Sequence, residues 1–284
     1  FLDQQRPQAD VRTDELADPP ETLDSCRKIF ERRIRYWELR PMEGGIGLIS
    51  APADSRVLLT SFAGLPGSNF SSNSDSNPGV SQGGLFIKEK LFSYEELIGT
   101  DKKEWLDRFR HGDTAVFRLT PDKYHYNHAP VSGRVVDIYE INGRYHSCNP
   151  GAVVRSVTPY SKNRRVITVI DTDVKDGTGI GMVAMVEIVA MMIGRIVQCY
   201  SYEKYDRPKD VEPGLFIHRG RPKSLFRPGS STTVLIFEKN RVRFNADLVA
   251  NQARTDVRSR FTQGFGRPMV ETEVAVRETI GKEK

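Results

Sequence analysis

The chain has 284 residues, of which 38% are apolar and 28% charged, which excludes a collagen, a coiled coil and a wholly disordered chain. It is long enough to bury a sizeable core in one large domain or two small ones. Lysine and arginine number 42 against 37 acids, so the net charge is +5. That excess suits an anionic surface or ligand, but it is too small to indicate nucleic acid by itself.

The first 45 residues divide into two parts. Residues 1–22 are polar, acidic and proline-containing, which predicts a poorly ordered segment. In residues 23–45, apolar side chains recur at helical spacing as far as Trp37, which predicts an amphipathic helix over residues 23–39. Its basic face carries Arg27, Lys28, Arg32, Arg33 and Arg35. Such a helix either lies on an anionic membrane or packs against its own domain with the charges in solvent.

From residue 46 onward the pattern changes to short β-like runs divided by turn residues. Helices are expected only at residues 94–109 and 246–252, and residues 64–84 form a long loop rich in Gly, Ser and Asn. The expected fold class is therefore α+β, predominantly β, with peripheral helices around one domain of residues 46–284. Strands are predicted at residues 47–52, 56–62, 114–120, 133–141, 152–160 and 164–170, and a hairpin or paired strands at 232–244.

The most apolar stretch is residues 180–197. It contains Glu187, Arg195 and two glycines. A membrane-spanning helix needs about 20 apolar residues without such charges. The stretch is therefore predicted to be a buried strand or helix, and any membrane contact is expected to be peripheral.

Two short segments hold ionisable side chains that could carry chemistry. Asp54 follows an apolar strand, where an aspartate is usually a local turn cap. His125 and His128 lie three residues apart, and they could be structural, metal-binding or acid–base groups. A zinc site needs three or four ligands and no third is evident nearby, so no metal is expected. Acid–base use needs a carboxylate to orient the imidazole.

A third segment joins Gly229 and Ser230 directly to an apolar β-like run. Glycine lets the backbone take strained angles, and a hydroxyl just after it could attack the preceding carbonyl if a base were near. The simpler interpretation is a loop that starts a strand. The same Pro-Gly-Ser tripeptide occurs at residues 66–68, where no strand follows it.

Taken in order, these segments resemble the phosphatidylserine decarboxylase family over residues 47–244. The resemblance implies a carboxy-lyase that is made as a zymogen and cuts itself to create a covalent pyruvoyl group. The family-like pieces are SAPADS at 50–55, IKEKLFSYEELIG at 87–99, YHYNHAP at 124–130, residues 143–150 ending in Asn-Pro, residues 183–196, and Gly-Ser-Ser-Thr at 229–232.

The resemblance also implies roles for individual residues in self-cleavage. In the family, an Asp-His-Ser triad activates the serine that attacks the carbonyl of the residue before it. Carried over, Asp54 orients His128, His128 takes the hydroxyl proton, and Ser230 is both nucleophile and future pyruvoyl group. Cleavage between Gly229 and Ser230 leaves a β-chain that ends at residue 229 and an α-chain of residues 230–284.

The position of the cut has one alternative. Counting forward from Phe226 places it at Gly229–Ser230, whereas counting back from Phe237 favours Ser231, which aligns with members that carry Gly-Gly-Ser-Thr. Ser230 is preferred because a glycine before the scissile bond best tolerates strain. A further departure is that Pro222 and Ser224 stand where members often have an acid and a glycine.

The reaction expected from the resemblance is conversion of phosphatidylserine to phosphatidylethanolamine and carbon dioxide. The pyruvoyl carbonyl forms a Schiff base with the substrate amine and withdraws electrons as carbon dioxide leaves. His125 or His128 then delivers a proton to the α-carbon. The expected location is peripheral on the cytoplasmic side of an anionic membrane, or the cytoplasm, and the resemblance allows a homodimer.

The sequence leaves three alternative functions to compare with this one. Within the same chemistry, the substrate could be a free amino acid of the tryptophan type. A non-catalytic phospholipid-binding relative is disfavoured, because it would be expected to lose Asp54, His128 or Ser230. A serine hydrolase is disfavoured because no Gly-x-Ser-x-Gly elbow surrounds Ser230.

Overall fold

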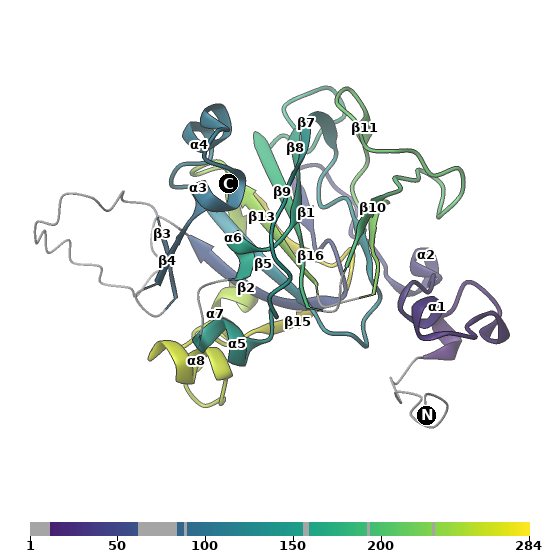
Figure 1. Cartoon of the computed structure of the whole chain (residues 1–284). Helices are drawn as coiled ribbons and strands as arrows, with labels where there is room; N and C mark the ends of the chain where they lie inside the picture. Colours follow the sequence, from purple (N-terminus) through teal and green to yellow (C-terminus); the bar gives the residue numbers. More distant parts are fainter. Residues whose placement is uncertain (1–11, 62–83, 88–89, 156–158, 192–193, 229–230) are drawn as a thin grey trace, which may run out of the picture.

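A computed structural model describes residues 12–61, 84–87, 90–155, 159–191, 194–228 and 231–284 (Figure 1). An antiparallel eight-stranded sheet lies at its centre, in the order β11-β7-β8-β9-β13-β5-β2-β15. These strands are β11 (Phe216–Ile217), β7 (Gly133–Ile141), β8 (Arg165–Asp171), β9 (Met182–Val189), β13 (Ser231–Phe237), β5 (Asp113–Leu119), β2 (Ser55–Ser61) and β15 (Thr272–Val274).

Smaller antiparallel sheets accompany the central one. The sheet that bears on function has the order β10-β12-β6 and comprises β10 (Ile196–Gln198), β12 (Pro222–Phe226) and β6 (Tyr126–His128). Another has the order β1-β16-β14 and comprises β1 (Leu48–Ser50), β16 (Thr279–Glu283) and β14 (Val242–Phe244). The pair β3 (Gly84–Ile87) and β4 (Lys90–Ser93) forms a hairpin.

The helices are short and peripheral. In Figure 1, α1 and α2 lie at the right, and α5 and α8 lie at the lower left. The helices are α1 (Cys26–Phe30), α2 (Tyr36–Leu39), α3 (Tyr94–Ile98), α4 (Lys103–Arg108), α5 (Pro150–Arg155), α6 (Pro159–Lys162), α7 (Ala246–Gln252) and α8 (Arg260–Phe265), preceded by 3-10 turns η1 (Thr13–Glu15) and η2 (Pro20–Thr22). Among the described helices, none is both long and apolar enough to cross a membrane.

Both faces of the central sheet are covered. Along β13, Val234 and Ile236 join a core with α3, α4 and α8, whereas Leu235 and Phe237 join a second core with the β1-β16-β14 sheet. Every residue of β13 is buried. A strand with two covered faces has no need of a polar face, which explains its nearly continuous apolar run.

The structure confirms the expected fold class, β-rich α+β with peripheral helices. It also places β7 at residues 133–141 and α7 at residues 246–252, as predicted. The apolar stretch 180–197 contains the buried strand β9. The loop expected at residues 64–84 lies almost entirely outside the described residues.

The strand predicted at residues 152–160 is wrong, because α5 and α6 occupy this region. Asn149 and Pro150 provide a helix start that the β-branched composition obscured. The Asn149 side-chain oxygen accepts a hydrogen bond from the Gly151 N–H at 2.9 Å, and proline at the first helical position suits a helix.

Two further predictions joined elements that the structure separates. Residues 232–244 do not form a hairpin, since β13 pairs with β5 and β9 while β14 pairs with β16. The helix predicted at residues 94–109 is divided into α3 and α4. Gly99 ends α3 with a φ of +112°, an angle that favours glycine and stops helical continuation.

The N-terminal segment also differs from expectation. Within residues 12–22, expected to be poorly ordered, η1 and η2 form, and the buried Leu16 bridges to Ile34. The single helix expected over residues 23–39 is instead α1 and α2, because Ile34 between them is tied through its backbone N–H and carbonyl to the Tyr205 hydroxyl.

The basic face predicted on that helix is largely neutralised within the segment itself. Its basic side chains form ion pairs with acids or donate hydrogen bonds to carbonyl oxygens. They therefore do not form a surface of unpaired positive charges. The pairs are Arg27–Glu31, Lys28–Asp24, Arg33–Asp18 and Arg35–Glu38, and Arg32 donates to the carbonyl oxygens of Ile29 and Asp122.

Candidate active site

The two candidate histidines lie at opposite ends of β6, which pairs with β12. His125 immediately precedes this strand, and His128 is its last residue. His128 lies opposite Pro222 at the start of β12. His125 lies at the other end, where its carbonyl oxygen accepts a hydrogen bond from the Phe226 N–H at 3.0 Å. Phe226 is three residues before Gly229 in the sequence, so His125 is the histidine bonded to the end of the strand that leads into the predicted cleavage junction.

His125 is fully buried, and its two ring nitrogens differ in their surroundings. Its Nδ1 lies 2.7 Å from the carbonyl oxygen of Lys123, which can only accept, so Nδ1 carries the hydrogen. Its Nε2 has no hydrogen-bond partner among the described residues. The Phe30 ring packs against the imidazole with centroids 3.6 Å apart. Burial lowers the pKa of His125 to about 3, so the ring is neutral at pH 7 with a lone pair on Nε2.

His128 is equally buried, but both of its ring nitrogens are engaged. Nδ1 donates to the carbonyl oxygen of Gly220 at 3.0 Å. Nε2 therefore accepts, from the Tyr124 hydroxyl 2.9 Å away, and the Tyr205 hydroxyl lies 2.8 Å from that of Tyr124. Burial lowers the pKa of His128 to about 3. His128 is thus a neutral imidazole of fixed tautomer at the inner end of a chain of hydroxyl groups.

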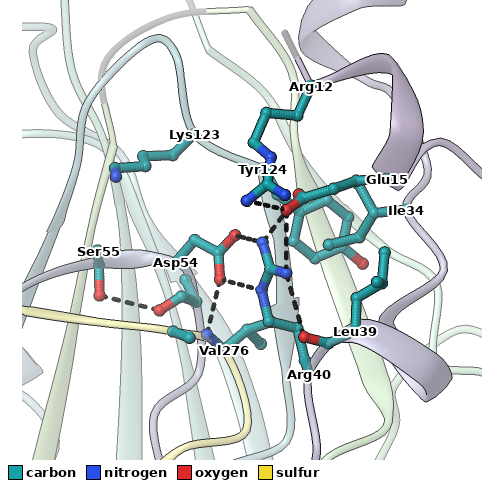
Figure 2. A network of polar contacts seen from close by, with 12 residues as sticks. Arg12, Glu15, Ile34, Leu39, Arg40, Asp54, Ser55, Lys123, Tyr124 and Val276 are labelled. Carbon is teal, nitrogen blue, oxygen red and sulfur yellow. Dashed lines mark hydrogen bonds and ion pairs between the residues drawn. The ribbon is translucent and has the colours of Figure 1, made fainter. Parts of the chain in front are cut away.

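Asp54 lies on the turn between β1 and β2, and Arg40 engages both of its carboxylate oxygens (Figure 2). Arg40 Nε lies 3.2 Å from Oδ1 and its NH2 lies 2.9 Å from Oδ2. The Val276 N–H donates to Oδ1 at 2.7 Å, and Arg40 also contacts the Glu15 carboxylate at 2.9 Å. Among the described side chains, no hydrogen bond joins Asp54 to His128, so the predicted acid is held by Arg40 instead.

Ser231 is the first described residue after the junction, and Gly229 and Ser230 lie outside the described residues. Ser231 begins β13, opposite Leu119 on one side and Val189 on the other. Its Oγ is buried and has no hydrogen-bond partner in the described part of the chain. An unpaired buried hydroxyl costs free energy in a folded protein and calls for an explanation. A catalytic role is one such explanation, so Ser231 is kept as the alternative nucleophile.

A small apolar cluster connects these parts of the site. It contains Phe30, Ala53, Leu119 and Phe226, with Ile196 packed against it. Phe30 contacts the His125 ring, Leu119 is the cross-strand neighbour of Ser231, and Ala53 precedes Asp54 in the chain. The cluster therefore joins the surroundings of His125, Ser231 and Asp54 in one water-poor region.

Some residues of the site carried no recognisable signal in the sequence. Arg40 and Phe30 come from the N-terminal segment, whose basic and apolar residues predicted only a surface helix. Tyr205 lies in a loop far from the histidines in sequence. Tyr124 is the one of these residues that the sequence could have indicated, because it directly precedes His125 in the YHYNHAP segment. In the described part of the chain, no three histidine, cysteine, aspartate or glutamate side chains group to hold a metal ion.

Comparison with known proteins defines the class of enzyme as the decarboxylases, which are carboxy-lyases. The family model described as phosphatidylserine decarboxylase matches residues 26–263. Phosphatidylserine decarboxylase proenzyme 2 of Oryza sativa subsp. japonica is 32% identical over 248 residues, which is 86% of this chain and 34% of the rice protein. The chain belongs to the phosphatidylserine decarboxylase family.

Bacterial relatives agree with this assignment. The phosphatidylserine decarboxylase proenzyme of Chlamydia muridarum is 30% identical over 256 residues, covering 89% of this chain and 73% of that protein. The proenzyme of Clostridium tetani is 28% identical over 227 residues, covering 80% of this chain and 65% of the relative. The resemblance identified from the sequence is thereby confirmed.

Proposed function

We propose that this chain is a self-processing, pyruvoyl-dependent decarboxylase of phosphatidylserine. The observation that carries the proposal is the hydrogen bond between Phe226 and His125, which joins a buried imidazole, whose Nε2 has no partner among the described residues, to the strand that leads into Gly229 and Ser230 in the sequence. The relatives named phosphatidylserine decarboxylase proenzyme support both the substrate and the processing.

The residues around the junction fit a pyruvoyl group formed there. Such a group is small and uncharged, and its reaction needs a side chain nearby that can accept a proton and return it. The apolar cluster of Phe30, Leu119 and Phe226 excludes water, while His125 Nε2 is buried and unpartnered in the described residues. A bound pyruvoyl carbonyl condenses with the substrate amine and accepts the electrons released as carbon dioxide leaves.

Self-cleavage requires a hydroxyl to attack the carbonyl of the preceding residue. The serine Oγ forms an ester bond as the peptide C–N bond breaks, and the amide nitrogen gains the proton. β-Elimination then breaks the Cβ–O bond and leaves a carboxylate at the end of the β-chain. Water then adds at the new start of the α-chain. The former serine nitrogen leaves as ammonia, and the pyruvoyl carbonyl remains. We propose Ser230 as this nucleophile, with Ser231 as the alternative.

We assign the proton delivery of the decarboxylation step to His125. Its Nε2 carries no hydrogen in the neutral ring, so it first takes a proton that the substrate ammonium gives up and then returns that proton to the α-carbon. Its Nε2 is unpartnered in the described residues and its ring is fixed by Lys123 and Phe30. His128 remains the predicted base for self-cleavage. To act, its Nε2 must exchange the Tyr124 hydroxyl for the serine hydroxyl. Orientation of His128 by Asp54 likewise requires the Asp54 carboxylate to leave Arg40.

The proposal commits to a lipid substrate and keeps a free amino acid as the alternative. The test is release of carbon dioxide by the purified protein from phosphatidylserine in detergent micelles, compared with free serine and free tryptophan. If only phosphatidylserine is decarboxylated, the proposal is supported. If only a free amino acid is decarboxylated, that amino acid is the substrate and the lipid assignment is wrong, although the proposed chemistry is retained. Peripheral membrane attachment, a location in the cytoplasm and a homodimer stay predictions.

A further inference from the structure

A polar cluster that is fully buried except for the half-buried Gln198 lies beside the site and takes no direct part in the proposed chemistry. We call it the Glu187 network. Its members are Glu187 on β9, Lys223 and Ser224 on β12, Gln198 on β10, Asn127 on β6 and Thr233 on β13. Glu187 and Lys223 are each 0% exposed, and their ion pair measures 2.8 Å from Nζ to Oε2.

The carboxylate of Glu187 is surrounded by donors. Oε1 accepts from Asn127 Nδ2 at 3.1 Å and from the Ser224 hydroxyl. Oε2 accepts from Lys223 Nζ and from Gln198 Nε2 at 3.1 Å. The two remaining side-chain oxygens are used as well, because Gln198 Oε1 accepts from Lys223 at 2.8 Å and Asn127 Oδ1 accepts from the Thr233 hydroxyl at 2.9 Å.

A β-bulge in β12 makes this arrangement possible. Neighbouring side chains of a regular strand point to opposite faces, yet Lys223 and Ser224 both reach the carboxylate of Glu187. The pairing of β12 with β6 shifts between Pro222 and Ser224, which makes Lys223 the extra residue. Bulges turn a side chain toward a new direction and are common beside active sites.

The network connects two sheets that carry different parts of the site. Glu187 and Thr233 belong to the central sheet, in which Thr233 lies two residues after Ser231 on the same strand face. Asn127, Lys223, Ser224 and Gln198 belong to the β10-β12-β6 sheet, which is flanked by His125 and contains His128. The network therefore fixes the sheet with the histidines relative to the strand with the proposed nucleophile.

Stability alone is a weak reason to keep such a group. Removing two charges from water is costly, and buried ion pairs can often be replaced by apolar residues with no loss of stability. A completely satisfied polar network does fix one geometry, because any shift leaves a buried donor or acceptor unpaired. A catalytic arrangement is sensitive to displacements of about 1 Å.

We propose that the Glu187 network is a positioning device that aligns the N-terminal end of β13 with His125 for decarboxylation. The inference rests on the proposed function. After cleavage, the hydrogen bond from Thr233 to Asn127 joins the α-chain to the sheet that carries the histidines. Glu187 and Lys223 hold that sheet in place and contact no reacting group, so they are positioning residues.

The first test removes the link from the α-chain. Thr233→Val keeps the shape of the side chain and deletes the bond to Asn127. Its matched control is Thr168→Val on β8, a fully buried threonine whose hydroxyl has no partner in the described residues. We expect Thr233→Val to be cleaved, and its kcat to fall at least about 10-fold with KM within about twofold of wild type. Thr168→Val should remain within about twofold in both.

The outcomes separate this inference from the proposed function. A wild-type protein that is never cleaved rejects the proposed function. If the Thr233→Val variant is cleaved and its kcat equals that of the Thr168→Val control, the positioning role is overturned. Thr233→Val that stays uncleaved, with an unchanged melting temperature, overturns the assignment to decarboxylation, because the network would then be needed for self-cleavage instead.

A second variant separates positioning from stability. Glu187→Leu combined with Lys223→Met replaces the ion pair by apolar side chains of similar volume. We expect this double variant to fold cooperatively with a lowered melting temperature, because the buried Ser224 hydroxyl loses its acceptor, and to lose kcat at least about 10-fold. A cooperatively folded double variant with wild-type kcat would show that the network only stabilises the fold.

Discussion

The backbone N–H of Phe226 donates to the carbonyl oxygen of His125 at 3.0 Å, which joins the end of β12 to the residue before β6. This bond joins His125, whose Nε2 has no partner in the described part of the chain, to the strand that leads into the Gly-Ser-Ser sequence. His128, at the far end of the same ladder, is held by Tyr124 and Gly220. The two histidines thus have distinct surroundings, and distinct roles follow.

We expect His125→Gln to be cleaved normally and to lose decarboxylation by about 100-fold or more, because general acid–base groups typically contribute that much. Cleavage is measured by denaturing gel and decarboxylation by carbon dioxide release. The control is His146→Gln, since His146 is exposed and its side chain is not part of the site. Wild-type turnover by His125→Gln would remove this histidine from the proton-delivery step.

The buried histidines should make stability fall in acid. Burial holds the pKa of His125 and His128 at about 3 when folded, against an ordinary value of 6.5, so below pH 6.5 the unfolded chain binds more protons. The free energy of unfolding should therefore decrease by about 1.4 kcal/mol per pH unit for each histidine as the pH falls from 6.5 toward 3, and be unaffected by them above 6.5.

This pH dependence is checked by urea unfolding of wild type and His125→Gln between about pH 7 and about pH 5. The variant has one fewer buried histidine, so its stability should fall less steeply over that range. An equal slope in the two proteins would show that His125 is not held neutral by the fold.

Arg40 should be important for stability because it holds two largely buried carboxylates, Glu15 and Asp54. We expect Arg40→Met to lower the free energy of unfolding by about 3 kcal/mol, since it leaves Asp54 without its ion-pair partner and Glu15 with only the exposed Arg12. Arg40→Lys should recover part of the loss, because lysine supplies the charge without the two-pronged geometry. Urea unfolding measures both variants.

The matched control for Arg40 is Arg254→Met, which removes an arginine from the exposed pair with Asp256. Exposed pairs contribute about 0–1 kcal/mol, so this variant should be nearly neutral. If Arg40→Met were no more destabilised than Arg254→Met, the Glu15–Arg40–Asp54 contacts would not tie the N-terminal segment to the domain.

Tyr124 should affect self-cleavage through His128. Tyr124→Phe removes the hydroxyl that meets Nε2, so a buried acceptor loses its donor at a cost of about 1–3 kcal/mol. We expect faster processing in a time course followed by denaturing gel, because the hydroxyl that His128 Nε2 must give up before it can accept from the serine is gone, together with a lower melting temperature. Tyr202→Phe is the control, because Tyr202 is 53% exposed. Processing of Tyr124→Phe at the wild-type rate would show that release of this hydroxyl does not limit the use of His128 as the base.

The sequence was most informative where one local pattern decides the structure. The alternation and turn residues around residues 133–141 predicted β7 with its observed bounds, and α7 was predicted equally well. Local patterns misled at residues 152–160, where a valine-rich run suggested a strand although Asn149 and Pro150 start a helix. There the helix-start signal outweighed β-propensity.

For the site, motifs identified residues but not their contacts. Asp54, His125 and His128 stand out in the chain, yet nothing local indicates that Arg40 holds Asp54 or that Tyr205 reaches Tyr124. These contacts join segments far apart in sequence, so they depend on tertiary packing. The Glu187 network was hidden for the same reason, because its members come from five strands.

The intact mass of the purified protein tests the central claim most directly. We predict two chains, broken between Gly229 and Ser230, with the smaller chain of residues 230–284 starting in a pyruvoyl group in place of serine, and an uncut precursor for Ser230→Ala. A break between Ser230 and Ser231 would assign the nucleophile to Ser231. A single uncut chain in a protein that releases carbon dioxide from phosphatidylserine would contradict the account.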